Sequence, residues 1–166
     1  MGDLYAVITA VCWSSAVILF DISTKSFTAI QLNVLKNFIG VFGFILTIVL
    51  FSIPLPNFSQ QDIFTLALSG FFGILIADGL FLESLKRLGS GLSAVVSTIY
   101  TPTVFIIAFI LFNETINLQS YIGGFLVLGG ITISVFQSPK TIKKRDLYIG
   151  ILFGIMANIL TAYSVL

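Results

Sequence analysis

The sequence predicts an all-α membrane protein whose chain crosses the bilayer six times. Of its 166 residues, 57% are hydrophobic and 9% are charged, and the mean hydropathy is +1.10. Ordinary soluble domains carry about 25% charged residues, so water is not the solvent for most of this chain. Six apolar runs in series, each about long enough to cross the hydrocarbon layer, leave too little polar surface to cover a soluble globule.

Polar breaks set the order of the predicted helices along the chain. The apolar runs occupy residues 4–20, 32–53, 63–82, 92–112, 118–136 and 147–166. The first run follows Asp3 and lacks the basic flank of a signal peptide, so we interpret it as a membrane helix. The later runs are separated by "FSIPLPNFSQQ", "KRLGSG", "NETIN" and "QSPKTIKKR". Connections this short predict antiparallel neighbours in a compact up-and-down bundle.

The basic residues are confined to one set of loops, which predicts an orientation. The first, third and fifth loops and their helix ends hold all eight: Lys25, Lys36, Lys86, Arg87, Lys140, Lys143, Lys144 and Arg145. The N-terminus and the other two loops carry Asp3, Asp62 and Glu114 and no basic residue. Because basic loops stay in the cytoplasm, we predict an external N-terminus in a plasma (inner) membrane. Beside a membrane helix, "KTIKKR" favours contact with lipid headgroups, and no nucleic-acid partner is expected.

A short internal similarity predicts a repeat. Asp-Leu-Tyr occurs at 3–5 and again at 146–148, each time directly before a membrane helix. Five helices separate the two copies, so the second would enter the membrane from the opposite side, as in inverted-repeat carriers. We therefore expect a first five-helix repeat over 1–138, a basic loop over 139–146 and the first helix of a second repeat over 147–166. On this interpretation the chain is a fragment of a longer carrier.

The stretch from 84 to 134 resembles the EamA-type half of the drug/metabolite transporter superfamily. The resemblance is carried by Pro102 in the fourth helix, Glu114 just beyond it, and Gly123 and Gly130 in the fifth. Trp13 and Lys36 are similar to an aromatic and a basic residue common in the first two helices of that family. The resemblance implies a carrier of small organic solutes or metabolites, built from two inverted five-helix halves.

Two ionisable residues lie inside the predicted spans. Lys36 is about five residues into the second helix, and Asp78 is about five residues from the end of the third. Both would therefore lie roughly 7 to 8 Å below the same membrane face, where charges are costly and usually functional. We expect them to pair or to line one polar cavity, with Asp78 as the candidate for proton or ion coupling. Alternatively, Lys36 snorkels and Asp78 lies at the headgroups.

Polar residues on three helices predict a solute pathway near mid-membrane. Proline can kink a membrane helix and free a carbonyl, so the polar fourth-helix residues around it are candidates for the path. Both repeats would add polar or aromatic groups at the depth where such carriers bind solute. The candidates are Trp13, Ser14, Ser97, Tyr100, Thr101, Pro102 and Asn158, together with Lys36 and Asp78. The commoner use of such hydroxyls is bonding to a neighbouring helix.

The remaining features predict structure rather than chemistry. Glu114 suits a cap at the start of the fifth helix, and Gly123 and Gly130 suit close helix packing. With no histidine and one cysteine, Cys12, the sequence predicts no metal, cofactor or catalytic cluster, so an enzyme is not expected. We predict a transporter that works by alternating access between inverted repeats, with the bilayer, a solute and a second repeat or another copy as partners. The alternative is a non-transporting membrane subunit or assembly partner.

Overall fold

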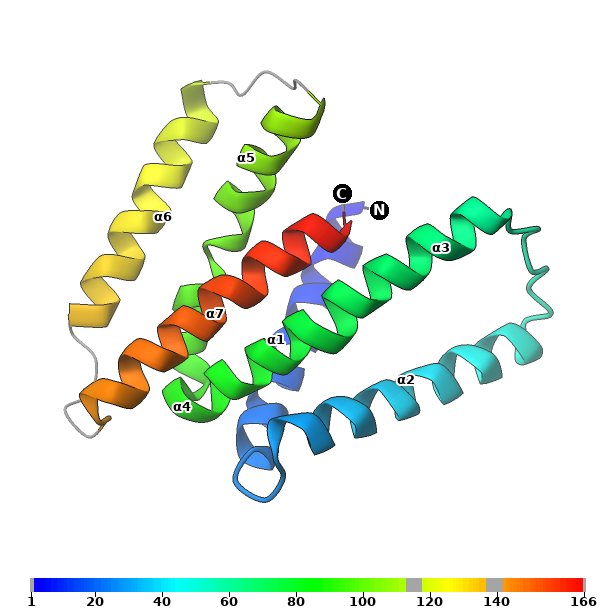
Figure 1. Ribbon diagram of the computed structural model, residues 1–166, viewed down its shortest axis with the longest axis horizontal. Coiled ribbons are helices and arrows are strands. Elements are labelled where there is room, and N and C mark those ends of the chain that lie inside the picture. The colour runs from blue at the N-terminus through cyan, green and yellow to red at the C-terminus, as the bar shows by residue number, and fades with distance from the viewer. Residues whose placement is uncertain (1, 113–117, 137–141, 166) are drawn as a thin grey trace.

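Helices form all the regular structure of the part of the chain described by the computed structural model, residues 2–112, 118–136 and 142–165. Figure 1 shows them in order: α1 (Gly2–Ser23), α2 (Ala29–Leu50), α3 (Gln60–Ser69), η1 (Gly70–Ala77), α4 (Asp78–Ser97), α5 (Tyr100–Phe112), α6 (Leu118–Phe136) and α7 (Lys144–Val165). Among the described residues, four helical stretches are long and apolar enough to cross a membrane. The helical membrane fold is confirmed.

The starts of α2, α3 and α7 each lie three residues earlier than hydropathy predicts, and capping boxes account for the first two. Thr28 and Gln31 form a capping box at the start of α2, and Ser59 and Asp62 form one at the start of α3. Each pair satisfies the backbone N–H groups that a helix start leaves without intrahelical partners, so the helix extends outward past its apolar run.

The third and fourth predicted helices are separated by a single glycine. α3, η1 and the first half of α4 form one continuous helical stretch from Gln60 to Leu88, and Gly89 then adopts a φ of 75°. Glycine enters this left-handed region without strain. Asp21 on α1 accepts a hydrogen bond from the backbone N–H of Ser90 at 2.9 Å, as a cap does at the start of a new helix.

The fourth predicted helix is itself interrupted one turn before Pro102. Thr98 and Ile99 form a turn between α4 and α5, and their backbone N–H groups bond three residues back, to Val95 and Val96. Pro102 has no N–H to donate to the carbonyl four residues before it, that of Thr98, so the regular ladder cannot pass this point.

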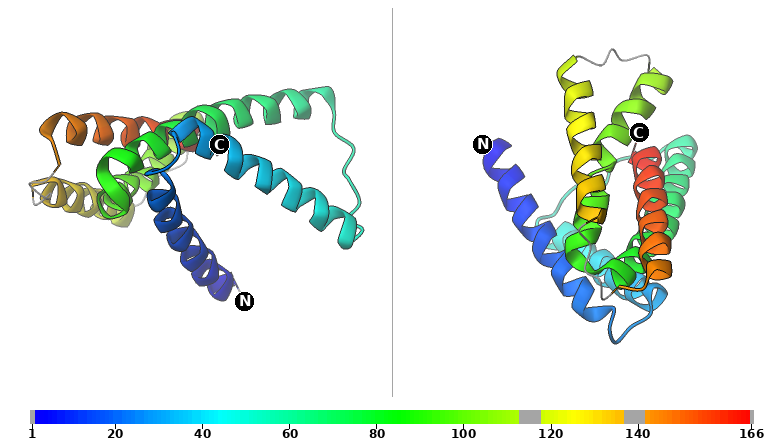
Figure 2. Two further views of the ribbon diagram at one scale, coloured as in Figure 1. Left: turned by 90° about the horizontal axis from the view of Figure 1, so that it is seen from below. Right: turned by 90° about the vertical axis from the view of Figure 1, so that its left-hand side faces the viewer.

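The helices do not form the compact up-and-down bundle that short connections predict. α7 packs against η1, α4 and α5, whereas α1 and α2 each pack against α4. Figures 1 and 2 show α1 and α2 diverging from the packed centre, and α5 and α6 running side by side at one edge of it. Sequence order therefore does not set the neighbours here; α4 and α7 together form the packed centre.

Glycines allow α7 to approach its neighbours closely. A Cβ atom added at Gly150 would lie 2.7 Å from Leu88, and one at Gly154 would lie 2.7 Å from Val96 and 2.9 Å from the Ser84 hydroxyl. Such contacts are possible only without a side chain, as in small-residue interfaces between membrane helices. The buried Ser84 Oγ also donates to the carbonyl oxygen of Gly150 at 2.7 Å.

Gly123 and Gly130 on α6 have no comparable contact. A Cβ added at either would meet nothing within 4 Å among the described atoms. Gly124, beside them, would approach Pro102 at 3.9 Å, an ordinary van der Waals distance. A packing role for Gly123 and Gly130 therefore stays a prediction, and the close approaches lie at α7 instead.

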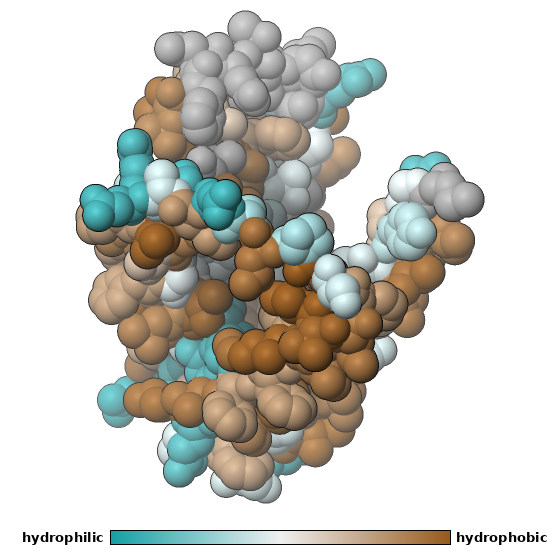
Figure 3. All heavy atoms as spheres, turned by 90° about the vertical axis from the view of Figure 1, so that its right-hand side faces the viewer, coloured by the Kyte–Doolittle hydropathy of each residue, from teal (hydrophilic) through white to brown (hydrophobic). Residues whose placement is uncertain are grey.

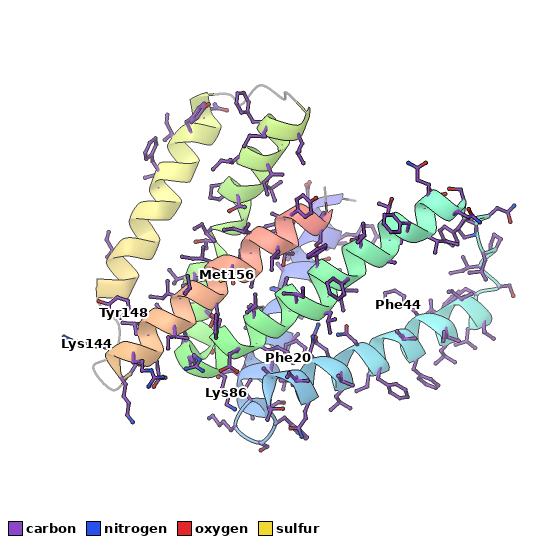
Figure 4. All side chains as sticks on the ribbon, viewed as in Figure 1. Phe20, Phe44, Lys86, Lys144, Tyr148 and Met156 are labelled. Atoms are coloured by element: carbon purple, nitrogen blue, oxygen red, sulfur yellow. The ribbon has the colours of Figure 1, made fainter. Side chains whose placement is uncertain are left out.

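Apolar side chains cover most of the outer surface. In Figure 3 they dominate the visible face, with hydrophilic residues gathered in separate patches. Phe44 on α2 is 74% exposed and Tyr148 on α7 is 68% exposed; both are labelled in Figure 4. Apolar exposure on this scale suits a chain whose solvent is lipid.

Candidate functional site

A cavity of about 290 Å³, the central cavity, lies where α1, α4, α5 and α7 meet. Its walls combine aromatic rings with one carboxylate, three hydroxyls and an amide. The lining residues are Trp13, Asp78, Phe81, Ser97, Tyr100, Ala157, Asn158 and Thr161. Five of the predicted pathway residues, from four different helices, therefore line the same space.

Asp78 links this cavity to Lys36 on α2. The ammonium group of Lys36 donates a hydrogen bond to Asp78 Oδ2, and the two side chains are 22% and 29% exposed. The two residues predicted to pair or share a cavity are thus in contact. Asp78 lines the cavity and Lys36 does not, so the negative end of the pair faces the cavity.

The ion pair lies further from the helix ends than hydropathy predicts. Lys36 is seven residues from the start of α2, and Asp78 is ten residues before Leu88, where its helical stretch ends. At 1.5 Å per residue, these positions are about 10 and 15 Å along the two helices. The greater depth follows from the capping box at Thr28 and from the continuation of the third helix to Leu88.

An unusual helical segment directly precedes Asp78. η1 is a π-helix of eight residues, a form that is rare and frequent at functional sites. The buried Asn33 of α2 donates from Nδ2 to the carbonyl oxygens of Ile74 and Leu75, at 3.0 and 3.3 Å. Asn37 in turn donates to the Asn33 side chain at 2.9 Å. These bonds tie α2 to η1 beside the ion pair and so position Asp78 against Lys36.

The polar residues of α7 present hydrogen-bond acceptors to the cavity. Asn158 is 8% exposed and donates from Nδ2 to the carbonyl oxygen of Gly154 at 2.6 Å. Thr161 donates its hydroxyl hydrogen to the carbonyl oxygen of Ala157 at 2.8 Å. Each side chain donates to a carbonyl of its own helix, which leaves Asn158 Oδ1, the second Nδ2 hydrogen of Asn158 and the lone pairs of Thr161 Oγ1 for a ligand.

Trp13 and Phe81 separate the central cavity from a second one. Their rings stack with centroids 6.3 Å apart and an interplanar angle of 30°. The second space, the outer cavity, has a volume of about 480 Å³ between α1 and α4 and is lined by Trp13, Phe81, Ser97 and the predicted Ser14, among others. The aromatic pair therefore stands between two spaces that share three lining residues.

The other predicted site residues lie apart from the central cavity. Thr101 is exposed, and Pro102, which is partly buried, lies beside Gly124. Neither lines the central or the outer cavity. Glu114, predicted as a cap, lies outside the described residues.

Several site residues were not predicted, although the sequence carries some signal for them. Asn33 and Asn37 lie three residues before and one residue after the predicted Lys36 in an apolar helix, and the spacing of four places the two asparagines on one helix face. Phe81 follows Asp78 by three residues and lies on its face for the same reason. Asp21 caps a helix 69 residues away, a contact that no local pattern in the sequence indicates.

A family model described as the EamA-like transporter family matches residues 1–136. The chain belongs to the EamA-like transporter family. No curated protein and no solved structure matches it. Membership makes this EamA-like chain an integral membrane protein of the drug/metabolite transporter type, a family of carriers rather than of enzymes. The match ends before α7, which supplies Asn158 and Thr161 to the central cavity.

Proposed function

We propose that this EamA-like protein moves a small organic solute or metabolite across the membrane and binds it in the central cavity. The observation that carries the proposal is the composition of that cavity. Aromatic walls with a few convergent polar groups are typical of small-molecule sites, and a volume of about 290 Å³ is near the lower end of their range of about 300 to 1,000 Å³. The ion pair at its edge is the kind of intramembrane charge that marks solute and ion paths.

Alternating access between two inverted repeats is the proposed mechanism. In this account residues 1–138 form the first repeat, 139–146 a basic loop, and 147–166 the first helix of the second. Solute would bind where the repeats meet, near mid-membrane, and rocking of one against the other would expose the cavity to each side in turn. The contribution of both α1 and α7 to the cavity wall supports this arrangement.

Asp78 is the proposed coupling group. It is an intramembrane carboxylate that both lines the cavity and contacts a basic residue, so a change in its protonation would alter the Lys36 contact and the cavity together. Proton-coupled carriers use carboxylates in this way.

The proposed orientation places the N-terminus outside and the basic loops in the cytoplasm of a plasma membrane. A thiol reagent that cannot cross the membrane tests it, applied to a Lys143→Cys variant that also carries Cys12→Ser. Labelling is expected in inside-out vesicles, whereas labelling of right-side-out vesicles would reverse the orientation.

Reconstitution tests the transport proposal itself. The purified chain in liposomes is incubated with a defined mixture of small amines, alcohols and carboxylic acids, and the vesicle contents are analysed by mass spectrometry. We expect at least one solute to accumulate faster than in empty vesicles, and Lys36→Ala and Asp78→Asn to lower that rate. Wild-type rates in both variants would contradict the role of the pair. No accumulation at all would favour a non-transporting subunit.

A further inference from the structure

The cavity wall carries a carboxylate and further hydrogen-bond acceptors, and these narrow the class of solute. Asp78 Oδ2 accepts the bond from Lys36, and Oδ1 has no hydrogen-bond partner among the described residues. Asn158 and Thr161 each donate to a carbonyl of their own helix and retain an oxygen acceptor. Asp78 Oδ1, Asn158 Oδ1 and Thr161 Oγ1 thus offer a ligand three hydrogen-bond acceptors, one of them on a carboxylate.

The aromatic wall has the same preference. Trp13, Phe81 and Tyr100 line the cavity together, and the faces of aromatic rings attract cations. The ammonium of Lys36 does not line the cavity, so a ligand meets the carboxylate end of the pair first. An anionic solute would find no described basic side chain on this wall, whereas a cation would find a carboxylate and three rings.

We propose that the central cavity binds solutes that carry a protonated amine on a small apolar or aromatic body. The inference rests on the proposed function, because it names the solute class of the same site. The ammonium donates to Asp78 Oδ1, Asn158 Oδ1 and Thr161 Oγ1, and the body packs against the stacked rings of Trp13 and Phe81. A carboxylate can accept several hydrogen bonds, so the amine shares Asp78 with Lys36 and competes with it.

Binding can be measured without transport, because Trp13 is the only tryptophan of the chain and lines the cavity. Its fluorescence is titrated in detergent or nanodiscs with three probes built on one benzene ring: benzylamine as its cation, benzyl alcohol and benzoate. We expect the amine to bind about tenfold more tightly than the alcohol, the usual worth of a charge-assisted hydrogen bond, and benzoate to bind most weakly. Equal affinities for amine and alcohol, or tighter binding of benzoate, would overturn the proposal.

Variants separate the amine site from a general effect of charge. Asp78→Asn should abolish the preference for amine over alcohol. Lys36→Met should strengthen amine binding several-fold, because it removes the competing ammonium, whereas a purely structural pair would give weaker binding or none. Glu83→Gln is the matched control, since Glu83 is 30% exposed, like Asp78, but pairs with Arg87 away from the cavity. It should keep the wild-type preference.

The outcomes also distinguish this proposal from the transport proposal. Uptake of a neutral or acidic solute in liposomes, with no amine preference in the fluorescence titration, would retain transport and remove the amine site. Amine-selective binding that depends on Asp78, in a chain that accumulates nothing, would retain the site and remove transport by this chain alone. If a variant does not fold, the titration of the wild-type protein with the three probes decides whether the amine site exists.

Discussion

The first and last helices begin with the same three residues but have very different surroundings. In α7, 28% of the apolar window is buried, against 6% in α1. With the 143-residue offset of the Asp-Leu-Tyr copies, Gly150 and Gly154 of α7 correspond to Val7 and Val11 of α1. The two glycines contact α4 closely, whereas the two valines are 61% and 59% exposed. The pattern of small residues, and not the shared helix start, therefore decides which of these two helices packs closely against α4.

A side chain placed in the close contact between α7 and α4 should have the largest effect on this contrast. Gly154→Leu would place a side chain where Val96 and Ser84 already lie within 3 Å of a Cβ atom. We expect a loss of about 3 kcal/mol of unfolding free energy, the upper part of the usual range for overpacking. Denaturant unfolding in detergent micelles measures it. Val11→Leu, at the corresponding position of α1, should change the unfolding free energy little, and an equal loss in both variants would remove the contrast.

Removing a buried hydrogen bond at the same interface should have an intermediate effect. Ser84 Oγ is buried and donates a hydrogen bond to the carbonyl oxygen of Gly150. Ser84→Ala removes this donor, so the buried carbonyl loses one of its hydrogen bonds. We expect a loss of about 1 kcal/mol in the same unfolding measurement. Ser15→Ala on α1 is the comparison, because Ser15 bonds only within its own helix, to Val11, and is exposed. An unchanged denaturation midpoint for Ser84→Ala would show that the hydrogen bond between Ser84 and Gly150 does not stabilise the contact between α4 and α7.

Neutralising the aspartate at the start of each helix should have the smallest effect. Asp146 accepts a hydrogen bond from Arg87 at 3.0 Å, with exposures of 42% and 28%, and Arg87 also binds Glu83. Exposed ion pairs contribute about 0.2 to 1 kcal/mol, so Asp146→Asn should lower stability by about 0.5 kcal/mol. This loss of unfolding free energy should be smaller at high salt concentration. Asp3→Asn should produce no salt-dependent change in the unfolding free energy. A larger loss for Asp3→Asn than for Asp146→Asn would contradict a stabilising role of the Asp146–Arg87 pair.

The membrane fold could be predicted from sequence because the bilayer demands long apolar helices. Helix starts were missed by three residues where capping boxes at Thr28 and Ser59 outweigh hydropathy. The prediction of which helices pack together was wrong, because short connections limit the path of the chain but do not determine which helix faces pack against each other. Hydropathy alone cannot predict that α7 lies against η1, α4 and α5.

The candidate site was predicted in part for a comparable reason. Depth along the helices was enough to propose that Lys36 and Asp78 meet, since both had to lie near the same membrane face. The π-helix before Asp78 was not predicted, because its carbonyls bond to Asn33, a residue about 40 positions away. Phe81 was not predicted either, because its role depends on stacking against Trp13, a residue on another helix. The sequence indicated which residues were costly to bury, and the tertiary contacts decided how they are used.

In the proposed function, α7 completes a solute cavity together with α1, α4 and α5. The decisive measurement is the uptake rate in liposomes before and after a small thiol reagent modifies Thr161→Cys in a Cys12→Ser background. Thr161 lines the central cavity, whereas Leu152 on the same helix is 55% exposed and gives the control Leu152→Cys. We expect modification to stop uptake by the Thr161→Cys variant and to leave the Leu152→Cys variant active. Full uptake by a completely modified Thr161 variant would contradict this expectation.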